Sequence, residues 1–164
     1  MNIIESSVAI AAPIEAVFDF HTDTKNLGLI SPPWMKAELI RESGVGLGKI
    51  IEMKVLQYNF FPSHWLVRIE EFERPFRLTD LVLSGPMKYF KHTRTFSQPC
   101  ASLTELRDHL EYEVPFGLIG RIANSISIRK MMEQMFEYRH QRTKEILEER
   151  FYIKEVPAAD VGRV

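Results

Sequence analysis

The segment Ser102-Leu-Thr-Glu-Leu-Arg-Asp-His-Leu-Glu-Tyr-Glu113 alternates between two kinds of side chain along most of its length. Glutamate, arginine and histidine occupy one set of positions, while leucine, threonine and tyrosine share the other set with Asp108. Successive side chains of a β-strand point to opposite faces of a sheet. The segment therefore predicts a strand with one face towards a core, and it places the Asp108 carboxylate on that inner face.

Five segments before this strand also predict strands, and turn residues separate them: residues 35–42, 49–58, 64–73, 76–83 and 87–97. Glycines 44, 46 and 48 mark the first turn, because glycine accepts the positive φ that tight turns require. Apolar side chains recur at every second position of the second and third segments, namely Ile51, Met53, Val55, Trp65, Val67 and Ile69. Strands joined by short turns predict an antiparallel meander with one apolar face.

Helices are predicted on both sides of this meander. Residues 3–12 form a first strand that Pro13 ends, and a short helix follows from Pro13 because proline is tolerated at a first helical position. Thr22 and Asp23 offer a cap for a second short helix towards Leu29. Residues 118–150 contain no proline and predict a long terminal helix.

The long helix carries one apolar stripe, which includes Met132, Phe136, Thr143 and Leu147 at helical spacing. Its basic residues are interleaved with glutamates, which predicts a solvated face of paired charges: Arg129, Lys130, Arg139, Arg142 and Lys144. The element order predicts an α+β fold with helices on one face of the sheet. Residues 1–150 form the predicted domain, and residues 151–164 form a predicted mobile tail.

Composition excludes several classes of function. The 164 residues include 21 basic and 22 acidic side chains, so no strong field attracts a polyanion, and we expect no nucleic-acid partner. Cys100 is the only cysteine, and the histidines other than His92 are scattered over separate predicted elements, so we expect no metal and no cofactor. Residues 1–8 lack a signal-peptide pattern, and no apolar stretch reaches the ~20 residues of a membrane span. We therefore expect a cytoplasmic protein.

The element order, with Ala11-Ala-Pro-Ile-Glu-Ala-Val-Phe18 after the first strand, resembles the START-like superfamily, also called SRPBCC or helix-grip proteins. Three further motifs are similar to bacterial SRPBCC proteins of unassigned function: Gly85-Pro-Met-Lys-Tyr-Phe-Lys-His-Thr-Arg-Thr-Phe96, Tyr112-Glu-Val-Pro-Phe-Gly117 and Met135-Phe136-Glu-Tyr-Arg139. The resemblance covers residues 3–150 and implies a curved, seven-stranded antiparallel sheet around the terminal helix. It also implies a central cavity, which in the wider superfamily binds lipids, hormones and polyketides.

The chain departs from these relatives on the strand that carries His92. The relatives are expected to read Trp-x-His-x-His-x-Phe, whereas this chain has Phe90-Lys-His-Thr-Arg-Thr-Phe96. Arg94 therefore stands where a second histidine is expected. Any chemistry of the relatives that needs both imidazoles does not carry over to this chain.

A polar cluster is predicted on the inner face of the last two strands. A turn centred near Pro99 and Cys100 brings His92 opposite Asp108, and Arg94 opposite Leu106 and diagonal to Asp108. A buried carboxylate needs a cationic or hydrogen-bonding partner, which His92 or Arg94 supplies. Two interpretations remain open: the cluster anchors a ligand's polar group, or it is a salt-bridge network satisfied by itself. In the first case, the apolar part of the ligand contacts Trp65, Phe90, Leu106, Tyr112, Met132 and Phe136.

The sequence leaves three functional hypotheses. The leading one is binding of a small, largely apolar molecule (lipid-like, polyketide-like or aromatic) between the sheet and the terminal helix. The alternative is a cyclase, dehydratase or hydrolase that uses His92 and Asp108 as an acid–base pair in the same cavity. The third is an accessory protein with a filled interior that recognises another protein. Neither the ligand nor the oligomeric state follows from the sequence.

Overall fold

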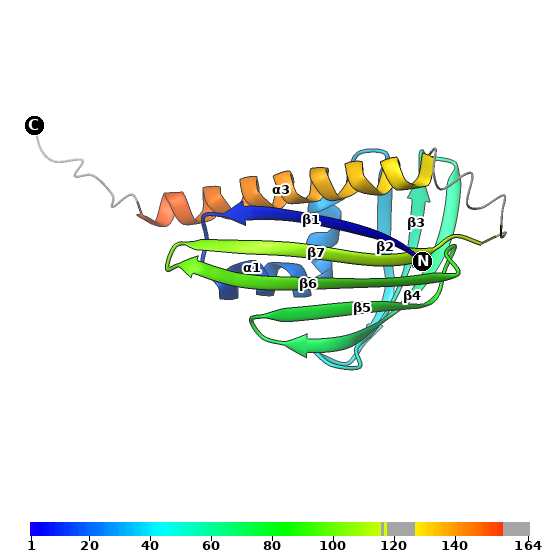
Figure 1. Ribbon diagram of the computed structural model, residues 1–164, viewed down its shortest axis with the longest axis horizontal. Helices are drawn as coiled ribbons and strands as arrows, with labels where there is room; N and C mark the ends of the chain where they lie inside the picture. The colour runs from blue at the N-terminus through cyan, green and yellow to red at the C-terminus, as the bar shows by residue number, and fades with distance from the viewer. Residues whose placement is uncertain (116, 118–126, 156–164) are drawn as a thin grey trace, which may run out of the picture.

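The computed structural model describes residues 1–115, 117 and 127–155, and it has the predicted α+β architecture (Figure 1). The strands are β1 (Asn2–Ile10), β2 (Met35–Ser43), β3 (Ile50–Gln57), β4 (Phe61–Glu73), β5 (Arg77–Ser84), β6 (Tyr89–Cys100) and β7 (Leu103–Glu113). The helices are α1 (Ile14–Thr22), the 3-10 helix η1 (Thr24–Ile30) and α3 (Arg129–Glu155). Asp23 caps η1 as predicted, since its side chain accepts a hydrogen bond from the backbone N–H of Lys25.

The seven strands form one antiparallel sheet in the order β1-β7-β6-β5-β4-β3-β2. The sheet is strongly curved: β1, β6 and β7 run along the molecule, whereas β2 and β3 run across it (Figure 1). Register shifts interrupt the pairing of β4 with β5 and of β2 with β3, and such bulges bend and twist a strand. α3 lies alongside β1 (Figure 1). The helix-grip arrangement implied by the resemblance is therefore present.

The alternation of β7 is confirmed by burial. Its inner side chains are at most 6 % exposed: Thr104, Leu106, Asp108, Leu110 and Tyr112. The turn between β2 and β3 is also confirmed, because Gly44, Gly46 and Gly48 all have positive φ angles. A Cβ at Gly46 would lie 3.4 Å from the ring of Phe72, which is an ordinary contact, so the positive φ is what favours glycine there.

The predicted pairing of β6 with β7 is wrong by two residues. Arg94 pairs with Asp108, and His92 pairs with Leu110. The prediction centred the turn too early, because β6 continues to Cys100, which pairs with Leu103 after a register shift beyond Ser97. A shift of two residues leaves every side chain on its predicted face, since side chains alternate with a period of two.

Several predicted boundaries also differ. β4 begins at Phe61 rather than at residue 64, and α3 continues to Glu155, so residues 151–155 belong to the helix rather than to the predicted tail. Residues 118–126 of the predicted long helix and residues 156–164 of the predicted tail lie outside the described residues. None of the described helices combines the length and apolar character that a membrane span requires.

Candidate functional site

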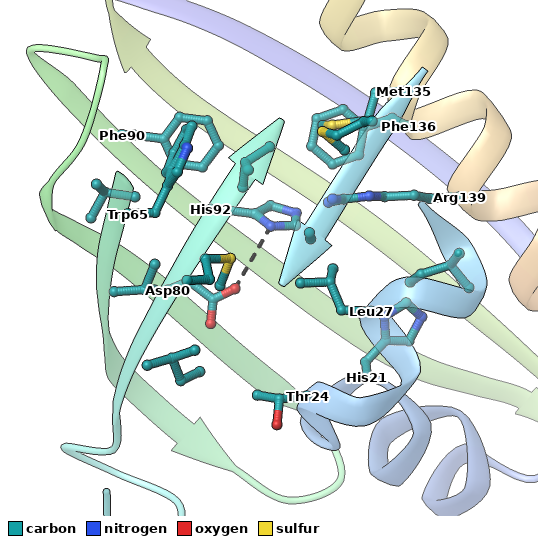
Figure 2. A pocket seen from close by; sticks show the side chains of 18 of the residues that line it. His21, Thr24, Leu27, Trp65, Asp80, Phe90, His92, Met135, Phe136 and Arg139 are labelled. Carbon is teal, nitrogen blue, oxygen red and sulfur yellow. Dashed lines mark ion pairs between the residues drawn. The ribbon is translucent and has the colours of Figure 1, made fainter. Parts of the chain in front are cut away.

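A cavity of about 700 Å³ lies between the inner face of the sheet and α3 (Figure 2). One wall consists of the apolar positions that the alternation of β3 and β4 predicted: Ile51, Met53, Val55, Trp65, Val67 and Ile69. The facing wall comes from α3 and contains Met131, Met132, Met135 and Phe136. Thioether side chains adapt to different shapes, so these two walls are suited to the apolar part of a bound molecule.

A buried carboxylate, Asp108, lies at the inner surface of this cavity. Its Oδ1 is 2.6 Å from Nε2 of His92, and its Oδ2 contacts Nε2 of His140. Oγ of Ser6 lies 3.2 Å from Nδ1 of His140 on the other side of that ring. Both oxygens of the carboxylate therefore have a partner within the protein.

Asp108 remains ionised in this environment. Burial would raise the pKa of its carboxyl, but the charge of His92 and the hydrogen bonds from His140 and His92 outweigh burial and lower the pKa well below its usual range. An ionised carboxylate only accepts hydrogen bonds, so both imidazoles donate to it through their Nε2–H groups. The three side chains thus form a closed hydrogen-bonded unit.

A second, partly buried pair joins Arg94 and Asp80. The Arg94 guanidinium contacts Oδ2 of Asp80, and one of its terminal nitrogens donates to the backbone oxygen of His21 over 3.4 Å. Nδ1 of His92 lies 3.9 Å from the same Asp80 oxygen, the ion pair drawn in Figure 2. Arg94 is thus near Asp108 along the sheet, as predicted, but its ion pair is with Asp80 on β5.

Arg139 of α3 is a third charged group at the cavity. The sequence predicted it on the solvated face of the helix, but it lines the cavity, and its side chain points into it (Figure 2). Its Nε is buried without a hydrogen-bond partner, and no ion pair or hydrogen bond among the described residues involves its guanidinium. Burial, followed by the charge of Arg94, lowers the pKa of Arg139 to about 10, which leaves it protonated at neutral pH.

His21 lines the cavity at the end of α1. Burial, followed by the charge of Arg94, lowers the pKa of His21 to about 3. The imidazole is therefore neutral at physiological pH. Its Nε2 is buried and has no hydrogen-bond partner among the described residues.

Seven of the nine predicted site residues line the cavity: Trp65, Phe90, His92, Arg94, Asp108, Met132 and Phe136. Leu106 and Tyr112 do not line it. Each is fully buried within a hydrophobic core, Leu106 among residues around α1 and Tyr112 among residues that include Ile4 and Leu110. Their inward orientation was predicted correctly, but packing leaves no cavity surface at these two positions.

Sequence reasoning missed four polar residues of the site: His21, Asp80, Arg139 and His140. Helical spacing held a signal for two of them, since Met132, Met135, Phe136, Arg139 and His140 follow one another at steps of three or four residues along α3. Asp80 lies between Leu78 and Val82 at alternate positions of β5, and all three line the cavity.

The histidines expected on separate elements are partly brought together, because the side chains of His140 and His92 both contact Asp108. Among the described residues, no group of three or more His, Cys, Asp or Glu side chains is placed to hold a metal ion.

Comparison with known proteins gives a family for this chain. Residues 10–136 match the family described as polyketide cyclase/dehydrase and lipid transport. The chain belongs to this family. No curated protein matches it by sequence.

Solved structures of this family's fold support the architecture. The Zhui aromatase/cyclase from Streptomyces sp. R1128 is similar with a TM-score of 0.74 and 16% identity, over 92% of this chain and 95% of that one. A START superfamily protein from Mycobacterium smegmatis is similar with a TM-score of 0.70 and 12% identity, over 90% of this chain and 97% of that one. At these identities the likeness shows the START-like fold.

Proposed function

We propose that this member of the polyketide cyclase/dehydrase and lipid transport family binds a small, largely apolar molecule between its sheet and α3. The cavity of about 700 Å³ carries this proposal. Pockets for small molecules measure about 300–1,000 Å³, and apolar walls with a few polar groups are typical of them. Trp65, Phe90, Met132 and Phe136 are proposed to contact the apolar part of the molecule.

The inner surface offers two different environments along β6. Phe90 packs against Trp65 with ring centroids 5.4 Å apart, whereas His92 and Arg94 belong to the polar cluster further along the strand. A molecule with an apolar body and one polar end matches this division. Its polar end would lie towards His92 and Arg94.

Native mass spectrometry of freshly purified protein tests this proposal, with analysis of any small molecule released on denaturation. Val55 lines the cavity, and its neighbour Lys54 lies on the opposite face of β3. We expect Val55→Trp to lose the bound molecule because the indole occupies its space, while Lys54→Trp retains it. A bare chain mass, together with unchanged tryptophan fluorescence on addition of carboxylates and alcohols of 6–16 carbons, would contradict the proposal.

Acid–base catalysis in the same cavity is the second candidate. The observation that favours it is the 2.6 Å contact between His92 and Asp108, because a carboxylate fixes the orientation of an imidazole and raises its basicity. Nε2 of His92 is occupied by Asp108, so Nδ1 is the atom available for proton transfer. Once a ligand is known, loss of turnover with retained binding in His92→Ala would indicate catalysis. Loss of binding would indicate an anchor.

A further inference from the structure

The charged groups around the cavity differ in how completely they are paired. Asp108 contacts two imidazoles, and Asp80 contacts Arg94. Lys49 also lines the cavity, and its Nζ lies 2.7 Å from Oε2 of Glu42. Each of these charges has an opposite charge or hydrogen-bond partner supplied by the protein.

Arg139 is the exception among the described residues that face the cavity. Its guanidinium carries a positive charge, its Nε is buried, and none of its nitrogens has a partner in the described part of the chain. Leaving a buried charged donor unpaired is costly, and proteins ordinarily satisfy such groups. An acceptor that enters the cavity would complete the hydrogen bonding of this guanidinium.

We propose that Arg139 binds the anionic end of the ligand, so that the molecule in the cavity is an amphipathic carboxylate rather than a neutral apolar compound. This inference rests on the proposed function. A guanidinium presents two parallel N–H groups that match the two oxygens of a carboxylate. Met135 and Phe136, one turn earlier on α3, line the same cavity and would contact the adjoining hydrocarbon.

The surroundings favour a single negative charge on the ligand. Arg94 is already paired with Asp80, so among the described arginines that line the cavity Arg139 is the one left to neutralise the ligand. The carboxylates of Asp80 and Asp108 also line the cavity and would repel a second negative charge. A monoanionic carboxylate therefore matches the site better than a phosphate dianion. His21 offers a further polar contact, since its Nε2 also has no hydrogen-bond partner in the described part of the chain.

Matched probes that differ only in the head group test this inference. Trp34 and Trp65 both line the cavity, so quenching of tryptophan fluorescence reports the binding of dodecanoate, 1-dodecanol and dodecyl phosphate at neutral pH. We expect dodecanoate to bind the wild type about 10- to 100-fold more tightly than 1-dodecanol, as a hydrogen bond to a charged group allows. Dodecyl phosphate should bind more weakly than dodecanoate.

Arg139→Met should reduce the affinity for dodecanoate to that for 1-dodecanol and leave the affinity for the alcohol unchanged. Arg139→Lys should retain part of the preference, because it keeps the charge without the two parallel donors. Arg142→Met is the matched control on the same helix, since Arg142 pairs with Glu145 at the surface. It should change neither affinity.

The outcomes separate this inference from the proposed function. Two outcomes would overturn the role of Arg139: equal binding of dodecanoate and 1-dodecanol to the wild type, or a preference for dodecanoate that survives Arg139→Met. In either case the proposed binding of an apolar molecule would still stand. Tighter binding of dodecyl phosphate would overturn the assignment to carboxylates. If no probe binds the wild type, the proposed function fails and this inference fails with it. Should Arg139→Met not fold, Arg139→Lys gives the decision, and a preference for dodecanoate as large as that of the wild type would then overturn the role of Arg139.

Discussion

Asp108 and Arg139 face the same cavity from opposite sides, and they differ in what the protein provides for them. Asp108 on β7 accepts hydrogen bonds at both oxygens, from His92 and His140. Arg139 on α3 has no partner among the described residues. A satisfied buried charge contributes to holding sheet and helix together, whereas an unsatisfied one lowers stability and is available to a ligand. The comparison assigns Asp108 a structural role and agrees with the binding role proposed above for Arg139.

Removing the satisfied carboxylate should have the largest effect. Asp108→Asn replaces an acceptor oxygen by an NH2 group that faces an imidazole N–H, so one donor is left unpaired. We expect the free energy of unfolding to fall by about 3–5 kcal/mol, as is typical when one partner of a buried pair is lost. Chemical denaturation measures this change.

Glu105→Gln provides the control for Asp108→Asn. Glu105 is on the same strand and pairs with Arg107 at the surface, where an ion pair contributes about 0–1 kcal/mol. The wild type should also lose the contribution of Asp108 in acid. The folded pKa is lowered, so this stability is present above pH 3.8 and declines as the pH falls below that value. A loss no larger than that of Glu105→Gln would contradict a structural role for Asp108.

The sequence predicted the sheet side of this comparison better than the helix side. Strict alternation on β7 placed Asp108 inward, because a strand has only two faces and the opposite one is wholly polar. The partner was harder to predict: Arg94 lies directly opposite Asp108 yet pairs with Asp80 from the other neighbouring strand. Pairing of side chains across three strands depends on rotamers and bulges, which a periodic pattern does not contain.

The orientation of Arg139 could not be read from charge patterning. Arginines interleaved with glutamates are typical of a solvated helix face, and the prediction holds for Arg129, which pairs with Glu133. No glutamate lies three or four residues from Arg139. Arg139 instead follows the cavity side of α3, one turn after Met135 and Phe136. Burying an unpaired arginine contradicts the rules that favour stability, and such exceptions are expected at functional sites.

Removing the charged partner of Arg94 would extend the comparison. Asp80→Asn removes the partner of Arg94, whose side chain is 12% exposed, and we expect a loss of about 2 kcal/mol in the free energy of unfolding. Asp19→Asn breaks the exposed pair of Asp19 with Arg74 and should cost less than about 1 kcal/mol. Chemical denaturation of both variants measures the two losses in the free energy of unfolding. Similar losses would show that partial burial does not strengthen the ion pair of Arg94 with Asp80.

The lowered pKa of His21 should make the stability of the protein depend on pH. Its folded pKa of about 3 lies below its ordinary value of 6.5, so the unfolded chain takes up a proton between these values and the folded chain does not. Stability is therefore unaffected above pH 6.5 and falls with decreasing pH, by about 1.4 kcal/mol at pH 5.5. His21→Phe should remove this part of the decline. Unfolding measured at pH 7.5 and 5.5 gives the difference, and the same decline in both proteins would contradict a neutral His21 whose Nε2 is buried.

The smallest effect should also have the opposite sign. Arg139→Met removes an unpaired charge and fills its space with an apolar side chain, so the ligand-free protein should gain about 1 kcal/mol in its free energy of unfolding. Arg142→Met, which loses a surface pair with Glu145, should lose up to about 0.5 kcal/mol. Thermal and chemical unfolding of protein stripped of bound molecules measure both changes. A loss at Arg139 as large as that of Asp80→Asn would mean that the guanidinium is already satisfied within the protein, and the contrast with Asp108 would disappear. A gain would mean that this chain keeps a destabilising arginine at a position where none of the described residues pairs with it and an incoming acceptor can.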